Sequence, residues 1–219
     1  MDTKQKSSPL SRWQTELISS AIALLCLFLV VSFPAQDFLQ NLSRGFFILF
    51  LLPVLYIKLI LKQDLRDFGF NLQNPRVGFS WATGMLAASF LIIFFLIRFS
   101  DFENNYLIPA YLAKSFGLFL FYELVVTNFI LFIYEFFFKG FLLFLLARKL
   151  GFLAVFIQAL TFILFMTIVG IMDWKMVPAA ILAFTGGIVA YKSRSFIYSY
   201  LMGLVFILFL DAYIIHIFK

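Results

Sequence analysis

The longest apolar stretch of the chain spans Phe116 to Leu146 and reads FGLFLFYELVVTNFILFIYEFFFKGFLLFLL. As one α-helix it is about 46 Å long at 1.5 Å per residue, which exceeds the roughly 30 Å hydrocarbon core of a bilayer. The helix must therefore tilt in a membrane or emerge along one interface. A helix of this length and composition needs lipid as its solvent, and this requirement decides the fold class.

The composition of the whole chain agrees with this conclusion. Of the 219 residues, 63% are hydrophobic and only 13% are charged, whereas soluble proteins are about half apolar and about a quarter charged. Because each membrane helix uses roughly 20 apolar residues, seven helices take up about two thirds of the chain. This excludes a separate soluble catalytic domain, a nucleic-acid-binding domain and a long disordered tail.

Seven apolar segments are expected to cross the membrane, with breaks at Gly151, Asp173 and residues 192–194 between the last four. They are Leu17–Phe33, Phe46–Leu61, Val77–Ile97, Phe116–Leu146, Phe152–Met172, Val177–Tyr191 and Phe196–Phe218. We predict an all-α, polytopic helical membrane bundle in a single domain, residues 17–218, after a cytoplasmic N-terminal segment, residues 1–16. The first helix is expected to stay as an anchor, since no small-x-small cleavage site follows it.

Lys and Arg side chains predict the orientation, because they gather in cytoplasmic loops. If the segments alternate in direction, one side collects Lys4, Lys6, Arg12, Lys58, Lys62, Arg66, Arg76, Lys139, Arg148, Lys149, Lys192 and Arg194. The other side collects Arg44, Arg98, Lys114, Lys175 and Lys219. We therefore predict a multi-pass cell-membrane protein with a cytoplasmic N-terminus and an outside C-terminus. The net charge of +6 is explained by this topology, and no nucleic-acid partner is expected.

The chain has a single cysteine, Cys26, and a single histidine, His216. One cysteine forms neither an internal disulfide nor a thiolate cluster, and one histidine cannot supply a two-histidine zinc site. No metal and no cofactor are expected.

Most of the ionisable groups inside the predicted spans lie on the longest stretch. Such groups are costly in lipid, so each is a candidate functional residue. At 100° per residue, Asn128 and Glu135 share a helix face, and Glu135 and Lys139 are four apart in the favourable Glu-before-Lys order. By helix rise, Glu135 lies about 20 Å from Arg148 at the cytoplasmic end.

Two interpretations of Glu135 remain open at this point. In the first, its carboxylate lines a water-filled cavity and acts as a general base. In the second, Glu135 and Lys139 neutralise each other as an intrahelical ion pair, which needs no substrate.

Other polar groups in the spans favour structural roles. We predict that Glu123 is an interfacial or packing carboxylate, and that Asp211 and His216 are solvated or interfacial. Gln158 and Thr161 are expected to form hydrogen bonds between helices.

The centre of the longest stretch resembles a known motif. Residues 134–143 read YEFFFKGFLL and continue to RKLG at residues 148–151. The pattern is similar to the E-E-x-x-x-R-G signature of the CPBP family, which includes type II CAAX prenyl endopeptidases, bacteriocin-processing and immunity proteins, and Abi proteins. Two further pieces resemble the family in the same order, namely residues 67–70 (DFGF), and Gly186–Gly187 followed by residues 194–196 (RSF). The resemblance covers about residues 62 to 210 and implies a CAAX-protease-like bundle.

In active members, two glutamates and two downstream histidines activate a water in a cavity open to the cytosol. The resemblance assigns the second glutamate to Glu135, but Tyr134 stands at the first and Lys139 replaces the arginine. A phenol ionises near pH 10 and cannot replace a carboxylate base at neutral pH. Lys139 keeps the charge of arginine without its guanidinium fork.

The histidine motifs of the family are missing as well. The F-x-x-x-H motif matches Phe162 to Met166, which places Met166 at the first histidine. The last motif, H-x-x-x-N, falls on Gly203 and Ile207. Methionine and glycine offer no imidazole to donate a proton or bind a metal. Since the loss of one member of a catalytic set removes most of the rate, we expect a relative without peptidase activity.

Our first hypothesis is a pseudopeptidase that binds a membrane peptide or membrane protein, with lipid around it. Its candidate site has Glu135 as the would-be base with Tyr134 and Lys139 beside it. The residues expected to line the cavity are Asn128, Phe162, Met166, Gly203 and Ile207.

Two alternatives come from other functional classes. One is an active, divergent intramembrane endopeptidase in which Glu135 is the base and Tyr134 the electrophilic donor. The other is a transporter with Asn128, Glu135 and Lys139 along its path, although the duplicated halves common in transporters are not evident.

Overall fold

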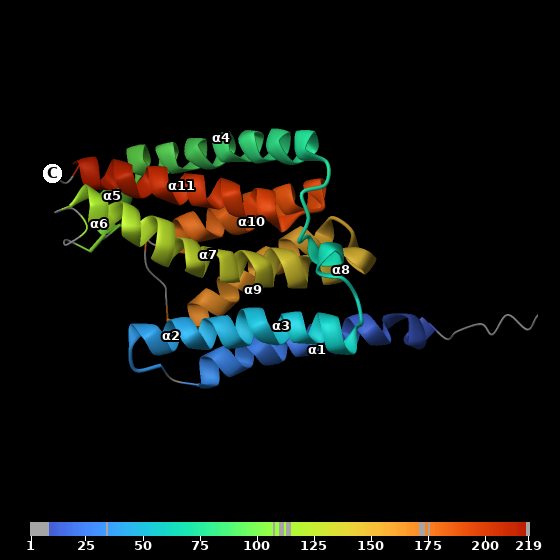
Figure 1. The fold of residues 1–219 in the computed structure, drawn as a ribbon. Helices are drawn as coiled ribbons and strands as arrows, with labels where there is room; N and C mark the ends of the chain where they lie inside the picture. Colours follow the sequence, from blue (N-terminus) through green and yellow to red (C-terminus); the bar gives the residue numbers. More distant parts are fainter. Residues whose placement is uncertain are drawn as a thin grey trace, which may run out of the picture.

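The computed structural model describes residues 9–33, 35–106, 108, 109, 112, 115–170, 174 and 176–217. These residues form helices joined by short connections, and no strand occurs among them (Figure 1). The all-α class is therefore confirmed. Helices long and apolar enough to cross a membrane are Phe38–Ile60, Pro75–Phe99, Phe116–Leu150, Met176–Ser193 and Phe196–Ile217. Length and composition thus support five spans, and seven remains a prediction.

The other two predicted segments lie in shorter apolar helices, Leu17–Ser32 and Leu153–Ile168. The first of these belongs to α1 (Pro9–Ser32), so helix already starts within the segment 1–16 that we predicted as a separate N-terminal piece. Residues 1–8, the break at Asp173 and the predicted end at Phe218 lie outside the described residues.

The second helix pairs with α1 as a hairpin (Figure 1). It runs through α2 (Phe38–Gly45), η1 (Phe46–Leu51), α3 (Leu52–Leu55) and η2 (Tyr56–Ile60). It starts at Phe38 and not at Phe46, because Asp37 caps it by accepting a hydrogen bond from the Gln40 backbone N–H at 2.8 Å. Residues 38–45 include several polar side chains, so a prediction based on apolar runs starts this helix too late.

The longest predicted segment is confirmed as one continuous helix, Phe116–Leu150. It runs through α6 (Phe116–Phe121), η5 (Tyr122–Thr127), α7 (Asn128–Tyr134), η6 (Glu135–Leu142) and α8 (Leu143–Leu150). The η5 and η6 stretches have wide π-helical turns, which are rare and often lie at functional sites. The whole of η6 is buried, including Phe136, Phe137 and Phe138.

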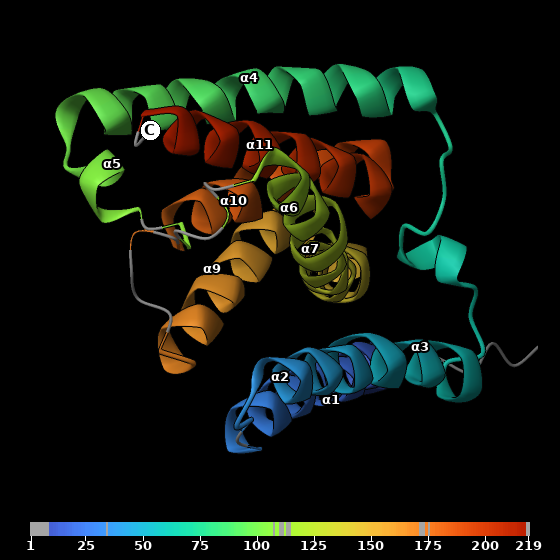
Figure 2. The same ribbon diagram turned by 60° about the vertical axis from the view of Figure 1, so that its left-hand side comes forward.

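The remaining helices complete the bundle. They are α4 (Pro75–Phe99), α5 (Phe102–Asn105), α9 (Leu153–Ile168), α10 (Met176–Ser193) and α11 (Phe196–Ile217). Figure 2 shows α10 and α11 between α4 on one side and α7 and α9 on the other, with the α1–α3 hairpin on the far side of α7, where it packs against the long helix. The long helix, α9, α10 and α11 therefore meet beside η6.

A short connection joins the hairpin to the bundle. Its 3-10 helix η3 (Leu65–Phe68) buries Phe68, and the Arg148 guanidinium lies 4.9 Å from the centre of the Phe68 ring. Ser195, in the turn between α10 and α11, donates to the carbonyl oxygens of Gly69, at 3.1 Å, and Asn71. The connection therefore fixes the start of α11.

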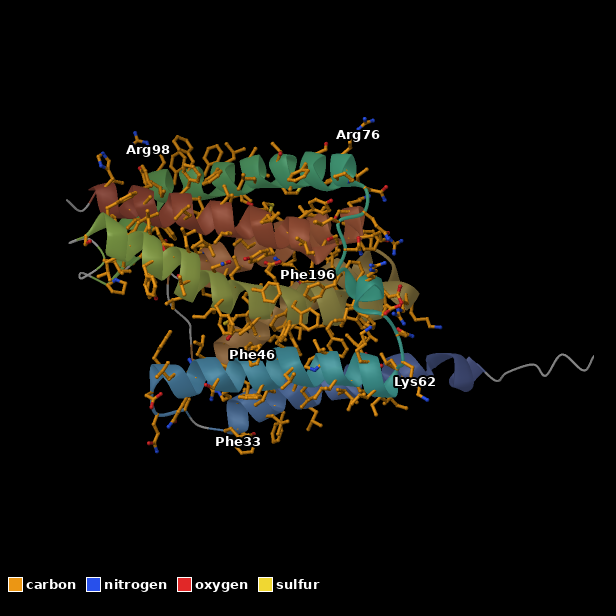
Figure 3. The ribbon with its side chains drawn as sticks, viewed as in Figure 1. Phe33, Phe46, Lys62, Arg76, Arg98 and Phe196 are labelled. Atoms are coloured by element: carbon orange, nitrogen blue, oxygen red, sulfur yellow. The ribbon has the colours of Figure 1, made fainter. Side chains whose placement is uncertain are left out.

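The basic side chains lie at two ends of the bundle. Lys62 and Arg76 lie at the end where α1 begins, whereas Arg98 lies at the end near the C-terminus (Figure 3). This separation agrees with alternating segments, while the side of the membrane that each end faces stays a prediction. Lys139 is buried within its helix and is not an orienting loop charge. Of the Lys and Arg residues counted for the orientation, those outside the described residues are Lys4, Lys6, Lys114, Lys175 and Lys219.

Candidate functional site: an apolar cavity beside Glu135

An inner cavity of about 330 Å³ lies beside η6, with walls from the long helix, α9, α10 and α11. Most of its walls are apolar side chains. The predicted site residues that line it are Tyr134, Glu135, Lys139, Phe162, Met166 and Ile207. Residues separated by more than 70 positions in the sequence thus meet at one cavity.

The two remaining candidates do not line this cavity. Asn128 forms hydrogen bonds with the Tyr200 hydroxyl and, at 3.1 Å, with the Leu124 carbonyl oxygen. Gly203 lies one layer back, because a β-carbon at this position would be 3.6 Å from Leu131 and from Leu182, which both line the cavity. Asn128 and Gly203 are thus not among the residues that line the inner cavity.

Glu135 and Lys139 form the intrahelical ion pair that was one of the two interpretations. Lys139 Nζ donates to Glu135 Oε1, and both side chains are only 4% exposed. The Ser199 hydroxyl of α11 donates to the other carboxylate oxygen, Oε2, at 2.7 Å. Both oxygens of the carboxylate are therefore hydrogen-bonded.

Gly186 on α10 makes room for this cluster. A β-carbon at Gly186 would overlap Lys139 Nζ and Ser199 Oγ. Gly186 is one of the residues that resemble the family. Its place beside the ion pair explains why only glycine, which has no β-carbon, fits at this position. Lys139, Ser199 and Gly186 together close the space around the Glu135 carboxylate.

Gln158 and Thr161 of α9 differ in their partners. Gln158 is fully buried, and its side-chain amide donates to the Ala183 carbonyl oxygen of α10 at 3.0 Å, which confirms an interhelical bond. Its carbonyl oxygen, Oε1, has no hydrogen-bond partner. Thr161 bonds to the Ile157 carbonyl oxygen within its own helix at 2.8 Å, so the prediction of an interhelical bond there is wrong.

A second polar group lies farther along the long helix. Glu123 is 1% exposed and lies close enough to Asp211 of α11 to interact with it electrostatically. Tyr106 donates to Asp211 Oδ1 at 2.8 Å. Asp211 is therefore buried, so a solvated role is wrong while an interfacial one stays a prediction, and His216 is exposed. The contact of Tyr106 with Asp211 spans 105 positions, so no local pattern could reveal it.

Two further cavities lie toward the turn between α1 and α2. The entrance cavity, of about 420 Å³, is lined by residues that include Asp37, Arg44 and Val169. A small cavity of about 50 Å³ borders it. Asn41 lines all three cavities, and Tyr134 lines the small and the inner one. A row of hollows therefore leads from the turn to the ion pair. The sequence predicted for Arg44 only a role in orientation, and its place in the entrance cavity could not be foreseen.

The arrangement suits binding better than hydrolysis. A general base needs a carboxylate that can reach a water, whereas the Glu135 carboxylate is bound by Lys139 and Ser199. Within the described residues, no group of three His, Cys, Asp or Glu side chains is placed to hold a metal ion. Comparison with known protein families, with curated proteins and with solved structures finds no match to this chain.

Proposed function

We propose that this protein is a seven-helix membrane protein of the CPBP type that has kept the scaffold and lost the peptidase chemistry. It acts by binding a membrane peptide or a membrane-protein partner in the inner cavity. The observation that carries the proposal is the closed cluster of Glu135, Lys139 and Ser199 at the wall of an apolar cavity.

The charge of the cluster supports this proposal. A buried ion pair whose acceptors are filled is stable only while both partners stay in place, because a lone buried charge is costly. To act as a base, Glu135 would have to leave Lys139 and Ser199. A catalytic role would therefore require breaking contacts that hold the bundle together.

The apolar walls support a ligand drawn from the membrane. Lipid tails are as apolar as the cavity, so a ligand is favoured over lipid by close packing and by hydrogen bonds at a few points. Phe162 and Met166 supply such packing surfaces, and methionine adapts to ligands of different shape.

The first prediction separates this proposal from an active peptidase that uses Glu135 as base and Tyr134 as donor. Both of those side chains line the cavity, so a substrate in the cavity could reach them and the alternative can be tested. In liposomes, the purified protein is expected to cleave an added apolar transmembrane peptide no faster than Glu135→Gln does. Mass spectrometry of the peptide measures cleavage. Turnover by the wild type that Glu135→Gln abolishes would establish the peptidase instead.

The second prediction tests binding at the cavity. With the photoreactive residue p-benzoylphenylalanine in place of Met166, illumination is expected to cross-link a synthetic apolar membrane peptide added to the purified protein. The same residue in place of Phe94 is the control, because Phe94 is 60% exposed on α4. Cross-linking should be several-fold stronger at Met166. Equal yields at the two positions would contradict binding in the cavity.

A further inference from the structure

Arg44 is the one basic side chain among the described residues that line the entrance cavity. Its Nη1 donates to the Phe33 carbonyl oxygen, and its Nη2 donates to Asn41 Oδ1 at 2.5 Å. Its Nε atom is buried without a hydrogen-bond partner. Among the residues that the structure describes, Arg44 forms no ion pair. The guanidinium is thus held in place by neutral groups, and no described carboxylate forms an ion pair with it.

The nearby acidic residue has another partner. Asp37 also lines the entrance cavity, but its carboxylate accepts a hydrogen bond from the Gln40 backbone at the start of α2. It serves as the cap of that helix. Each terminal nitrogen of Arg44 carries a second N–H beside the one that is bonded. An anionic group entering the cavity would therefore find a fixed guanidinium with donors to spare, and guanidinium groups pair readily with carboxylates.

The cavities beyond Arg44 offer hydrogen-bonding groups as well as apolar walls. Tyr134 lines both the small and the inner cavity, and its hydroxyl forms no hydrogen bond with a described residue. Gln158 lines the inner cavity and has an acceptor, Oε1, without a donor. A ligand that fits these groups needs N–H or O–H donors along its length.

We propose that Arg44 anchors the ligand by binding the free C-terminal carboxylate of an apolar peptide, whose preceding residues lie along Tyr134 toward Gln158. This inference rests on the proposed function and adds a direction and a recognition group to it. Arg44 is a specificity-determining residue in this arrangement.

The observations favour a peptide over a fatty acid, although both carry a carboxylate and an apolar part. A peptide backbone supplies N–H donors for Tyr134 and for Gln158 Oε1, whereas an alkyl chain leaves such buried groups unpaired, at a cost.

The length of the row of cavities sets the size of the peptide. Gln158 lines the inner cavity and Ile168 the entrance cavity, and both belong to α9. Ten residues of helix correspond to about 15 Å. An extended chain covers this length with about five residues.

The experiment compares two synthetic pentapeptides of sequence Leu-Phe-Ile-Leu-Phe, labelled at the N-terminus, one with a free carboxylate and one with a C-terminal amide. Binding to the protein in phosphatidylcholine nanodiscs is measured by fluorescence anisotropy. The acid is expected to bind about tenfold more tightly than the amide, the effect of one charge-assisted hydrogen bond. Arg44→Gln should weaken the acid about tenfold and leave the amide unchanged. Arg98→Gln, at the exposed end of α4, should change neither.

Each other outcome contradicts a definite part of the proposal. If acid and amide bind equally and Arg44→Gln changes neither, the role of Arg44 is wrong while peptide binding stands. If neither peptide binds, the proposed function fails together with the inference. If palmitate binds in an Arg44-dependent way and neither peptide does, the cavities hold a fatty acid, and the peptide is excluded. Unchanged amide binding shows that Arg44→Gln has folded.

Discussion

Lys139→Met is expected to lower the free energy of unfolding by about 3–5 kcal/mol, because it leaves the Glu135 carboxylate buried without its cation. Both side chains of the pair are 4% exposed, so water cannot take over the lost contact. Methionine keeps most of the length and volume of lysine, and the effect therefore reports the charge. Unfolding of the protein in detergent micelles, followed by circular dichroism, measures the change.

Two further variants make this prediction specific. Glu135→Gln added to Lys139→Met removes the lone charge and is expected to restore most of the stability. Lys58→Met is the matched control, because Lys58 pairs with Asp64 at 2.8 Å while the two side chains are 45% and 77% exposed. Exposed ion pairs contribute little, so Lys58→Met should have a small effect. A Lys139→Met protein as stable as Lys58→Met would contradict the buried pair.

The parts of the site that could be predicted from the sequence are local along the chain. Glu135 and Lys139 are four residues apart on one helix, and helix geometry alone brings them together. The long helix could be predicted for the same reason, since its apolar run contains no proline and ends at Gly151. The places of Phe162, Met166 and Ile207 came from the family resemblance.

The parts that could not be predicted depend on contacts between distant helices. Ser199 meets Glu135 across 64 positions, and a serine in an apolar segment gives no sign of its partner. Arg44 lies in the polar first part of the second helix, in the last turn of α2, where a count of charges treats it only as a topology signal. The entrance cavity exists because the α1–α2 turn lies beside the end of α9, which is a matter of packing.

Gly69, in the loop before α4, packs against the start of α11 and so helps to position the site. It adopts a left-handed conformation, with φ +82°, at the end of η3. A β-carbon there would overlap the Phe144 ring and lie 2.9 Å from the Phe196 backbone nitrogen. Phe196 begins α11, the helix that carries Ser199 to Glu135. A side chain at position 69 therefore pushes on the start of this helix.

We expect Gly69→Ala to cost about 2–5 kcal/mol, from about 1–2 kcal/mol of left-handed strain and about 1–3 kcal/mol of overpacking. Gly170→Ala is the matched control, because Gly170 has φ +83° and nothing within 4 Å of an added β-carbon. It should cost only the strain. Unfolding in micelles compares the two variants. Equal losses would show that contact between Gly69 and the start of α11 does not matter. A larger loss for Gly69→Ala would tie the connection before α4 to the helix that completes the Glu135 cluster.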